Sequence, residues 1–220
     1  MGGPGDGPDS ALSARRIGLL GGSFNPAHSG HRAISLHALR ALGLDEVWWL
    51  VSPGNPLKPE AGMAPFEARL ASARAMARHA PIRVSGIEKR LKTRYTVTTL
   101  AKLTGIFPRH RFVWLMGADN LAQFHRWRDW RGIAREVPIA VIARPGYDAH
   151  ARASPAMSWL RRFVRPAGQA KYWTRWRLPA LVLLRFRPDT TSATRLRAAD
   201  PAWHRRFSPY PKPPGTSLKP

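Results

Sequence analysis

Short apolar runs alternate with helical patterns along most of the chain, and this alternation constrains the fold more than any other feature. The runs that read as strands cover 17–20, 47–51, 82–85, 111–116, 139–143 and 181–186. The helical patterns cover 31–42, 66–79, 96–104, 120–124, 127–135 and 192–199. Such alternation is typical of βαβ units with right-handed crossovers. We therefore expect a Rossmann-like α/β fold, a doubly wound parallel sheet with helices on both faces.

The segments that follow the apolar runs are the candidates for function. In open parallel sheets, ligands bind outside the carboxyl ends of the strands. The segments that stand in that position are 21–31, 52–58, 117–120, 144–146 and 189–197. We expect one domain over 15–206. The flanking segments, 1–14 and 207–220, are expected to be flexible tails because Gly and Pro are frequent in them.

The charge of the chain predicts anionic ligands. Lys and Arg total 36 against 13 acidic residues, a net charge of +23, and 151–220 alone hold 15 basic and 2 acidic side chains. This excess fits either a polyanion-binding surface or a general bias toward Arg, which outnumbers Lys 29 to 7. Neither an RNA-binding motif nor a zinc-finger spacing is present, so we favour the general bias toward Arg as the source of the excess and expect no nucleic-acid partner.

The absence of cysteine and of long apolar runs excludes several classes of protein. The chain has no cysteine, which excludes disulfides, thiolate catalysis and Cys-ligated zinc. Its apolar runs are too short for a transmembrane helix or a secretory leader. We therefore expect a cytoplasmic protein with no membrane partner.

The loop after the first apolar run, GGSFNPAHSGH, is the strongest local signal. Gly21 and Gly22 permit a sharp turn and a close approach of the backbone to a ligand. His28 and His31 are three residues apart, so they share one face of a first helical turn. Gly30 leaves room beside them for phosphate oxygens. The N-terminus of a helix attracts anions, and two imidazoles there can donate hydrogen bonds to a phosphoryl group.

Three other interpretations of this loop stay open. Two histidines are too few for a metal site, but they could contribute to one. The loop could also be an ordinary Gly-rich turn between a strand and a helix, or it could bind phosphate without catalysis. The glycine patterns of dinucleotide-binding folds and of P-loops are both absent, which argues against dehydrogenases and P-loop kinases.

The loop resembles the GG-x-F-[DN]-P-x-H-x-GH signature of the nucleotidyltransferase superfamily. More narrowly, the chain is similar to bacterial nicotinate-nucleotide adenylyltransferases over about 16–197. The segments that carry the narrower resemblance are PLK at 56–58, EKRLKTRYTVTTL at 88–100, MGADNLAQFHRW at 116–127, RPG at 144–146 and TSATRLR at 191–197. Five positions depart from the family pattern. Asn25 replaces the commoner Asp, Leu57 replaces a frequent His, and Arg94 replaces the usual Ser. In the last segment, Thr191 replaces the usual Ile and Ala193 replaces a frequent Ser.

The resemblance implies adenylyl transfer from ATP to nicotinate mononucleotide, giving nicotinate adenine dinucleotide and pyrophosphate, with Mg²⁺ held by ATP phosphates and water. The implied catalytic residues are His28, His31, Lys58 and Arg197. The implied ATP site comprises Gly21, Gly22, Ser23, Phe24, Asn25, Gly30, Gly117, Asp119, Arg144, Ser192 and Thr194. The implied nicotinate-nucleotide site comprises Tyr95, Thr96, Asp119, Trp127 and Arg144.

A purely structural role is an alternative for several of these residues. Lys58 could be a solvated loop lysine, Thr96 and Asp119 could be helix caps, and Trp127 could belong to the core. The segment 191–197 could be a capped basic helix.

Competing functions remain as well. They are an adenylyltransferase that uses nicotinamide mononucleotide or phosphopantetheine, and a nucleic-acid-binding protein on the same scaffold. The preference for the acid or the amide mononucleotide and a possible homo-oligomer are left open.

Overall fold

A single parallel sheet forms the centre of the computed structural model, which describes residues 14–54, 62–143, 151–186 and 193–207. The strand order is β3-β2-β1-β4-β5-β7-β6, and every recorded pairing is parallel. The strands are β1 (Arg16–Gly22), β2 (Glu46–Val51), β3 (Ile82–Ser85), β4 (Arg111–Gly117), β5 (Ile139–Ala143), β6 (Val164–Arg165) and β7 (Leu181–Arg185). This order confirms the expected parallel α/β fold.

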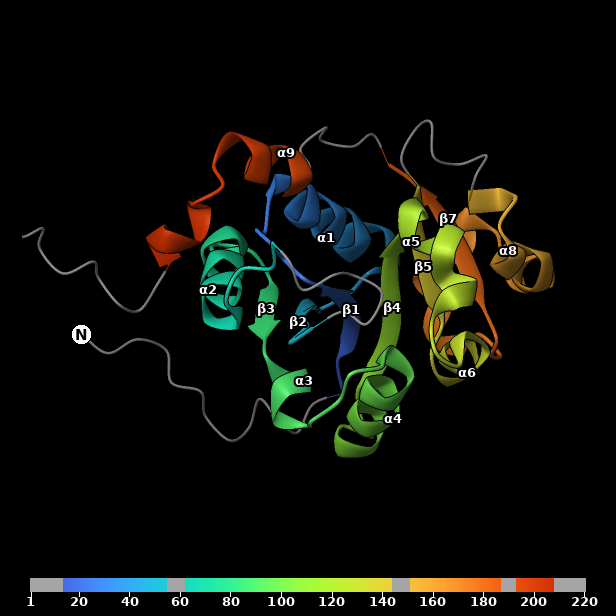
Figure 1. The fold of residues 1–220 in the computed structure, drawn as a ribbon. Coiled ribbons are helices and arrows are strands. Elements are labelled where there is room, and N and C mark those ends of the chain that lie inside the picture. Colours follow the sequence, from blue (N-terminus) through green and yellow to red (C-terminus); the bar gives the residue numbers. More distant parts are fainter. Residues whose placement is uncertain (1–13, 55–61, 144–150, 187–192, 208–220) are drawn as a thin grey trace, which may run out of the picture.

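Helices cover both faces of the sheet (Figure 1). The α-helices are α1 (Ser29–Leu42), α2 (Phe66–Ala77), α3 (Ile87–Arg90), α4 (Thr96–Ile106), α5 (Ala118–Gln123), α6 (Trp130–Glu136), α8 (Pro155–Leu160) and α9 (Ala193–Ala199). The 3-10 segments are η2 (Phe124–Arg126), η3 (Arg161–Phe163), η4 (Ala167–Arg175) and η5 (Trp203–Phe207). One core lies under α1, α2 and η4, and the other under α4, α5, α6 and α8.

The alternation of side chains along β2 explains how the sheet supports two cores. Trp48 and Leu50 pack into the core under α4, whereas Trp49 and Val51 pack into the core under α1. Successive side chains of a strand point to opposite faces. A continuous apolar run such as β2 is therefore what a strand buried on both faces requires.

The sheet reverses its direction of growth at β1. The chain adds β2 and β3 on one side of β1 and then returns to add β4 on the other side. The loops that follow β1 and β4 diverge at this switch point, and a crevice opens between them in doubly wound sheets. The fold therefore directs the loop after Gly22 and the residues after Gly117 toward a common crevice.

Some expected elements differ from the structure. The helix expected over 127–135 begins only at Trp130, because η2 ends before Trp127 and Asp129 takes a left-handed conformation with φ 43°. The Asp129 side chain caps α6 by accepting a hydrogen bond from the Gly132 N–H group. The helix expected over 31–42 begins earlier, at Ser29, and the one expected over 66–79 ends earlier, at Ala77.

Several elements in the structure have no counterpart in the sequence analysis, namely α3, α8, β6 and the four 3-10 segments. Most of them lie in 151–176, where arginines and tryptophans interrupt any periodic pattern. Among the described residues, none of the helices has the length and apolarity needed to span a bilayer. The proposed tail boundaries remain predictions.

Candidate active site

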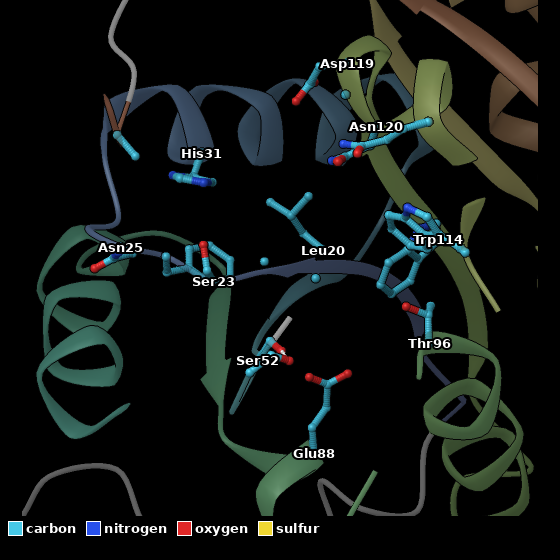
Figure 2. A pocket seen from close by; sticks show the side chains of 18 of the residues that line it. Leu20, Ser23, Asn25, His31, Ser52, Glu88, Thr96, Trp114, Asp119 and Asn120 are labelled. Atoms are coloured by element: carbon cyan, nitrogen blue, oxygen red, sulfur yellow. Dashed lines mark hydrogen bonds between the residues drawn. The ribbon is translucent and has the colours of Figure 1, made fainter. Parts of the chain in front are cut away.

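A cavity of about 510 Å³ opens at the switch point (Figure 2). Its lining combines the loop after β1, the ends of β2 and β4, the segments that begin α4 and α5, and the residues around η2. The lining residues are Leu20, Gly21, Gly22, Ser23, Phe24, Asn25, His28, His31, Ile34, Ser52, Gly54, Glu88, Arg94, Tyr95, Thr96, Trp114, Gly117, Asp119, Asn120, Gln123, Arg126, Trp127, Arg128 and Ala193. Residues from distant parts of the sequence thus meet where the fold predicts a ligand.

The loop after β1 turns sharply at Phe24, whose φ is 47°. This left-handed conformation is unfavourable for a bulky residue and persists only where its surroundings hold it. The Phe24 ring is fully buried, with its centroid 5.0 Å from that of Trp49 and 4.8 Å from that of His31. The packing of the Phe24 ring therefore holds the turn, and the turn places the residues that follow it beside the cavity.

Gly21 makes room for an aromatic side chain. A Cβ atom at this position would lie 2.5 Å from the Trp114 Cη2 atom. Gly21 also lines the cavity, so the expected close approach of its backbone to a ligand stays a prediction. Trp114 is buried in the core and also lines the cavity.

Gly21→Ala is expected to lower the free energy of unfolding by about 1–3 kcal/mol, because the added methyl group overpacks a buried indole that has little room to move. Urea denaturation of the full chain measures the effect. Gly105→Ala in α4 is the matched control, since no atom lies within 4 Å of its Cβ position. A Gly21→Ala variant as stable as the Gly105→Ala variant would contradict this explanation of the glycine.

Asn25 holds the loop to the segment before α2. Its Nδ2 atom donates to the Gly62 carbonyl oxygen at 2.9 Å, and its Oδ1 atom accepts from the Ala64 N–H group at 3.2 Å. An aspartate could not make the first of these bonds because an ionised carboxylate has no donor. The structure thus gives a physical reason for Asn at a position where the family commonly has Asp.

Arg69 joins four carbonyl groups, two of which belong to the cavity-lining residues Ser23 and Ser52. Arg69 lies on α2 and is 1% exposed. Its guanidinium group donates hydrogen bonds of 2.7–3.2 Å to the carbonyl oxygens of Ala64, Ser23, Ser52 and Pro53. No ion pair to Arg69 occurs within the described part of the chain. Burial lowers the pKa of its guanidinium. The sequence analysis missed this residue.

The two histidines meet at the start of α1. Their ring centroids are 3.9 Å apart, and His31 Nδ1 accepts a hydrogen bond of 3.2 Å from the His28 backbone N–H group. Because Nδ1 of His31 is an acceptor, its ring proton belongs on Nε2, where it can be donated to a ligand. His28 stands at the N-cap rather than inside the first turn. Gly30 is buried in the helix and does not line the cavity.

The C-terminal helix α9 reaches the same loop. Arg197 Nη1 donates to the Asn25 carbonyl oxygen at 2.6 Å, and Nη2 lies 3.4 Å from Thr194 Oγ1. Figure 1 shows α9 beside α1, and Ala193 lines the cavity. Arg197 and Thr194 adjoin the cavity without lining it. The candidates Lys58, Arg144 and Ser192, and the departure at Leu57, lie outside the described residues.

The candidate nicotinate-nucleotide residues Tyr95, Thr96, Asp119 and Trp127 also line the cavity. Tyr95 is the N-cap of α4, so Thr96 is the first helical residue and is not the cap. Asp119 is not a cap either, because Gly117 occupies that position before α5. The Trp127 ring packs edge-on against Trp114 and Phe124, yet it also lines the cavity.

Charged side chains surround this part of the wall. Arg94, Arg126 and Arg128 line the cavity and are exposed, and the Arg128 guanidinium lies 4.7 Å from the centroid of the Tyr95 ring. None of the three forms an ion pair with an acidic group of the described chain. Glu88 also faces the cavity, and its burial raises the pKa of its carboxyl group to about 7.

Some cavity residues that were not among the predicted site residues lie in segments that the sequence had already marked as functional. Glu88 and Arg94 belong to the 88–100 segment that carries the family resemblance, and Ser52 and Gly54 follow β2. Arg126 and Arg128 flank Trp127 directly. For Arg69 no such signal exists, since it resembles any polar residue on an Ala-rich helix.

Comparisons with known proteins identify the family of the chain. The cytidylyltransferase-like family matches residues 19–199. A protein of Erythrobacter litoralis named probable nicotinate-nucleotide adenylyltransferase is 65% identical over 87% of this chain and 88% of its own length. The chain belongs to the nicotinate-nucleotide adenylyltransferase family. A second member of the family, from Parvibaculum lavamentivorans, is 57% identical over 83% of this chain and 90% of its own length.

Solved structures confirm the fold of this nicotinate-nucleotide adenylyltransferase family member. The Plasmodium falciparum nicotinic acid mononucleotide adenylyltransferase complexed with NaAD superposes with a TM-score of 0.61 at 15% identity, covering 84% of this chain and 83% of that one. The same enzyme complexed with APC gives a TM-score of 0.59 at 14% identity, with the same coverage. At these identities the likeness concerns the fold.

Proposed function

We propose that the cavity is the site where this chain transfers the adenylyl group of ATP to nicotinate mononucleotide. The observation that carries the proposal is the histidine pair at the start of α1, which faces the same cavity as Tyr95, Thr96 and Trp127. One part of the cavity thus suits a triphosphate, and the other suits a flat aromatic ring.

The reaction needs no base from the protein. The phosphate of nicotinate mononucleotide is already ionised near neutral pH, and one of its oxygens attacks the α-phosphorus of ATP. The new O–P bond forms as the bond from the α-phosphorus to the bridging oxygen breaks, and that oxygen leaves with pyrophosphate. Catalysis then consists of positioning and of stabilising the charge that develops on the phosphates.

The residues near α1 would act on the phosphates. His28 and His31 would donate to the α-phosphate and to the leaving pyrophosphate, and Arg197 with Thr194 would hold the β- and γ-phosphates. Lys58 and Ser192 are proposed for the same task from the family resemblance alone. Gly21, Gly22, Ser23, Phe24, Asn25 and Gly117 line the cavity and are proposed to shape the ATP site. Gly30 does not line the cavity, and its place in the ATP site is proposed from the family resemblance alone.

We propose that a divalent cation enters this site bound to the substrate. The described residues contain no cluster of three His, Cys, Asp or Glu side chains able to hold a metal ion. Asp119 is exposed and lines the cavity, so it could contact a water of a hydrated Mg²⁺. Mg²⁺ bound to ATP would neutralise charge on the phosphates.

The mononucleotide would occupy the wall formed by Tyr95, Thr96, Trp127 and Asp119, with Arg144 proposed from the resemblance alone. Trp127 would stack on the pyridine ring. Guanidinium groups bind carboxylates more strongly than neutral amides. The cationic surroundings of this wall therefore support the acid mononucleotide over the amide.

We propose the cytoplasm as the compartment in which the reaction takes place.

The test of the function is pyrophosphate release from ATP and Mg²⁺ with nicotinate mononucleotide, compared with nicotinamide mononucleotide at equal concentrations. We expect turnover with a strong preference for the acid. A preference for the amide would correct the substrate, and absence of turnover with both would overturn the proposal.

Arg94→Ser is expected to lower the preference for the acid, expressed as the ratio of the two kcat/KM values, about tenfold. The reason is the loss of one guanidinium from the cavity wall proposed for the mononucleotide. A tenfold change corresponds to about 1.4 kcal/mol. Arg90→Ser is the matched control because Arg90 is exposed on α3 and does not line the cavity. If both variants kept the wild-type ratio, Arg94 would have no part in selecting the substrate.

A further inference from the structure

Glu88 is a buried acid for which the proposed reaction has no task. It is the second residue of α3, directly after β3, and it is 8% exposed. Figure 2 shows its carboxyl group pointing into the cavity, on the side of Ser52 and Thr96 and across from His31. Buried carboxyl groups are rare without a partner, because burial disfavours their charged form.

One oxygen of this carboxyl group is anchored and the other is available. Oε1 accepts a hydrogen bond of 3.1 Å from Thr99 Oγ1, and Thr99 is fully buried on α4. Within the described part of the chain, Oε2 has no hydrogen-bond donor and no ion-pair partner, and it is not closed off from the cavity. The orientation of Glu88 is thus fixed by the protein while one oxygen faces the space for a ligand.

The basic groups on the neighbouring elements do not pair with Glu88, so its charge is available to a cationic ligand. Lys89 on α3 pairs with Glu67 at 3.0 Å, and Arg90 beside it is exposed. Other charged or titratable groups around the cavity are His28, His31, Arg94, Tyr95, Asp119, Arg126 and Arg128. No basic group of the described chain forms an ion pair with Glu88.

We propose that Glu88 is a specificity-determining residue that recognises the positively charged pyridinium ring of the mononucleotide. This inference rests on the proposed function. The ring nitrogen of nicotinate mononucleotide is bonded to ribose, so the ring carries a permanent positive charge, and ATP has no such group. A carboxylate that is partly shielded from water attracts a cation far more strongly than one in bulk solvent.

The proposal has a pH signature. Because burial raises the pKa of Glu88 to about 7, much of the empty enzyme holds a neutral carboxyl group near neutral pH. A bound cation favours the ionised form, so binding releases a proton, and affinity falls as the pH drops below 7. The substrate's phosphate also titrates, with a pKa of about 6. The difference in pH dependence of binding between wild type and Glu88→Gln gives the contribution of Glu88 alone.

The experiment is calorimetric titration of the full chain, as wild type and as Glu88→Gln, with two probes at pH 8 and pH 6. The probes are nicotinate mononucleotide and its reduced form, whose dihydropyridine ring is uncharged but otherwise similar. Gln retains an oxygen that can accept from Thr99, so the variant keeps the anchor to α4. Glu67→Gln is the control, since it removes an exposed carboxylate that contacts α3 outside the cavity.

At pH 8 we expect Glu88→Gln to weaken binding of nicotinate mononucleotide about tenfold and to leave binding of the reduced form and of ATP unchanged. Between pH 8 and pH 6 the wild type should lose several-fold more affinity for the charged probe than the variant does. Equal losses for both probes would overturn the proposal in favour of a contact to ribose. Unchanged binding would overturn it in favour of a structural link to α4.

Failure of the proposed function would look different. Wild-type chain that binds neither probe and releases no pyrophosphate would overturn both proposals. Wild-type chain that turns over nicotinate mononucleotide, with Glu88→Gln indistinguishable in every titration, would overturn the role of Glu88 alone.

Discussion

His31→Gln is expected to lower kcat for pyrophosphate release about 10²- to 10³-fold, the usual effect of removing one donor that stabilises developing charge. The KM for ATP should change little if the contact strengthens mainly in the transition state. Gln is the informative replacement because its side chain can still accept from the His28 N–H group and so preserve the start of α1. Steady-state assays with ATP, Mg²⁺ and nicotinate mononucleotide measure the effect.

His37→Gln is the control for this prediction. His37 lies on the same helix, but its ring packs against Phe186 at 4.8 Å and does not line the cavity. It should keep kcat within about twofold, and both variants should melt within a few degrees of the wild type. A His31→Gln enzyme with wild-type kcat would remove His31 from the catalytic residues.

Arg69→Met is expected to have the largest effect on stability, lowering the free energy of unfolding by about 3–5 kcal/mol. The replacement fills similar space but leaves four carbonyl oxygens without their donor. An unsatisfied buried group costs about 1–3 kcal/mol, and the total stays below four times that cost because three of the four bonds are only partly buried. For a chain of this length the melting temperature should fall by about 10 °C. Urea and thermal denaturation measure both quantities.

Arg74→Met is the matched control for Arg69, because Arg74 is exposed on the same helix. It should change stability by less than about 0.5 kcal/mol. Arg69→Lys should recover only part of the loss, since one ammonium group cannot reach the four carbonyls that the planar guanidinium reaches. Equal stability of Arg69→Met and Arg74→Met would show that the loops hold their places without this arginine.

The parts of the fold that could be predicted are those determined by local chemistry. Runs such as VWWLV at 47–51 are apolar on both faces, which indicates a strand covered by helices on either side. The strand order could not be read directly, but the alternation of strands and helices was enough to predict a doubly wound sheet. The positions of functional segments after the strands followed from that topology.

The parts that could not be predicted depend on contacts between distant residues. The partners of Arg69 lie 5 to 46 positions away in the sequence, so no local pattern reveals them. The left-handed conformation of Asp129 moves the start of α6 from Trp127 to Trp130, although the sequence there is compatible with a longer helix. The role of Trp114 beside Gly21 depends on the pairing of β1 with β4.

The contact between Arg197 and Asn25 has a consequence for the order in which the structure forms during synthesis. It joins residues 172 positions apart, so the loop after β1 depends on a helix that is synthesised much later. Domains generally fold as units. A nascent chain that has not yet exposed α9 outside the ribosome therefore lacks this support for the loop after β1, even after all seven strands of the described sheet have been synthesised.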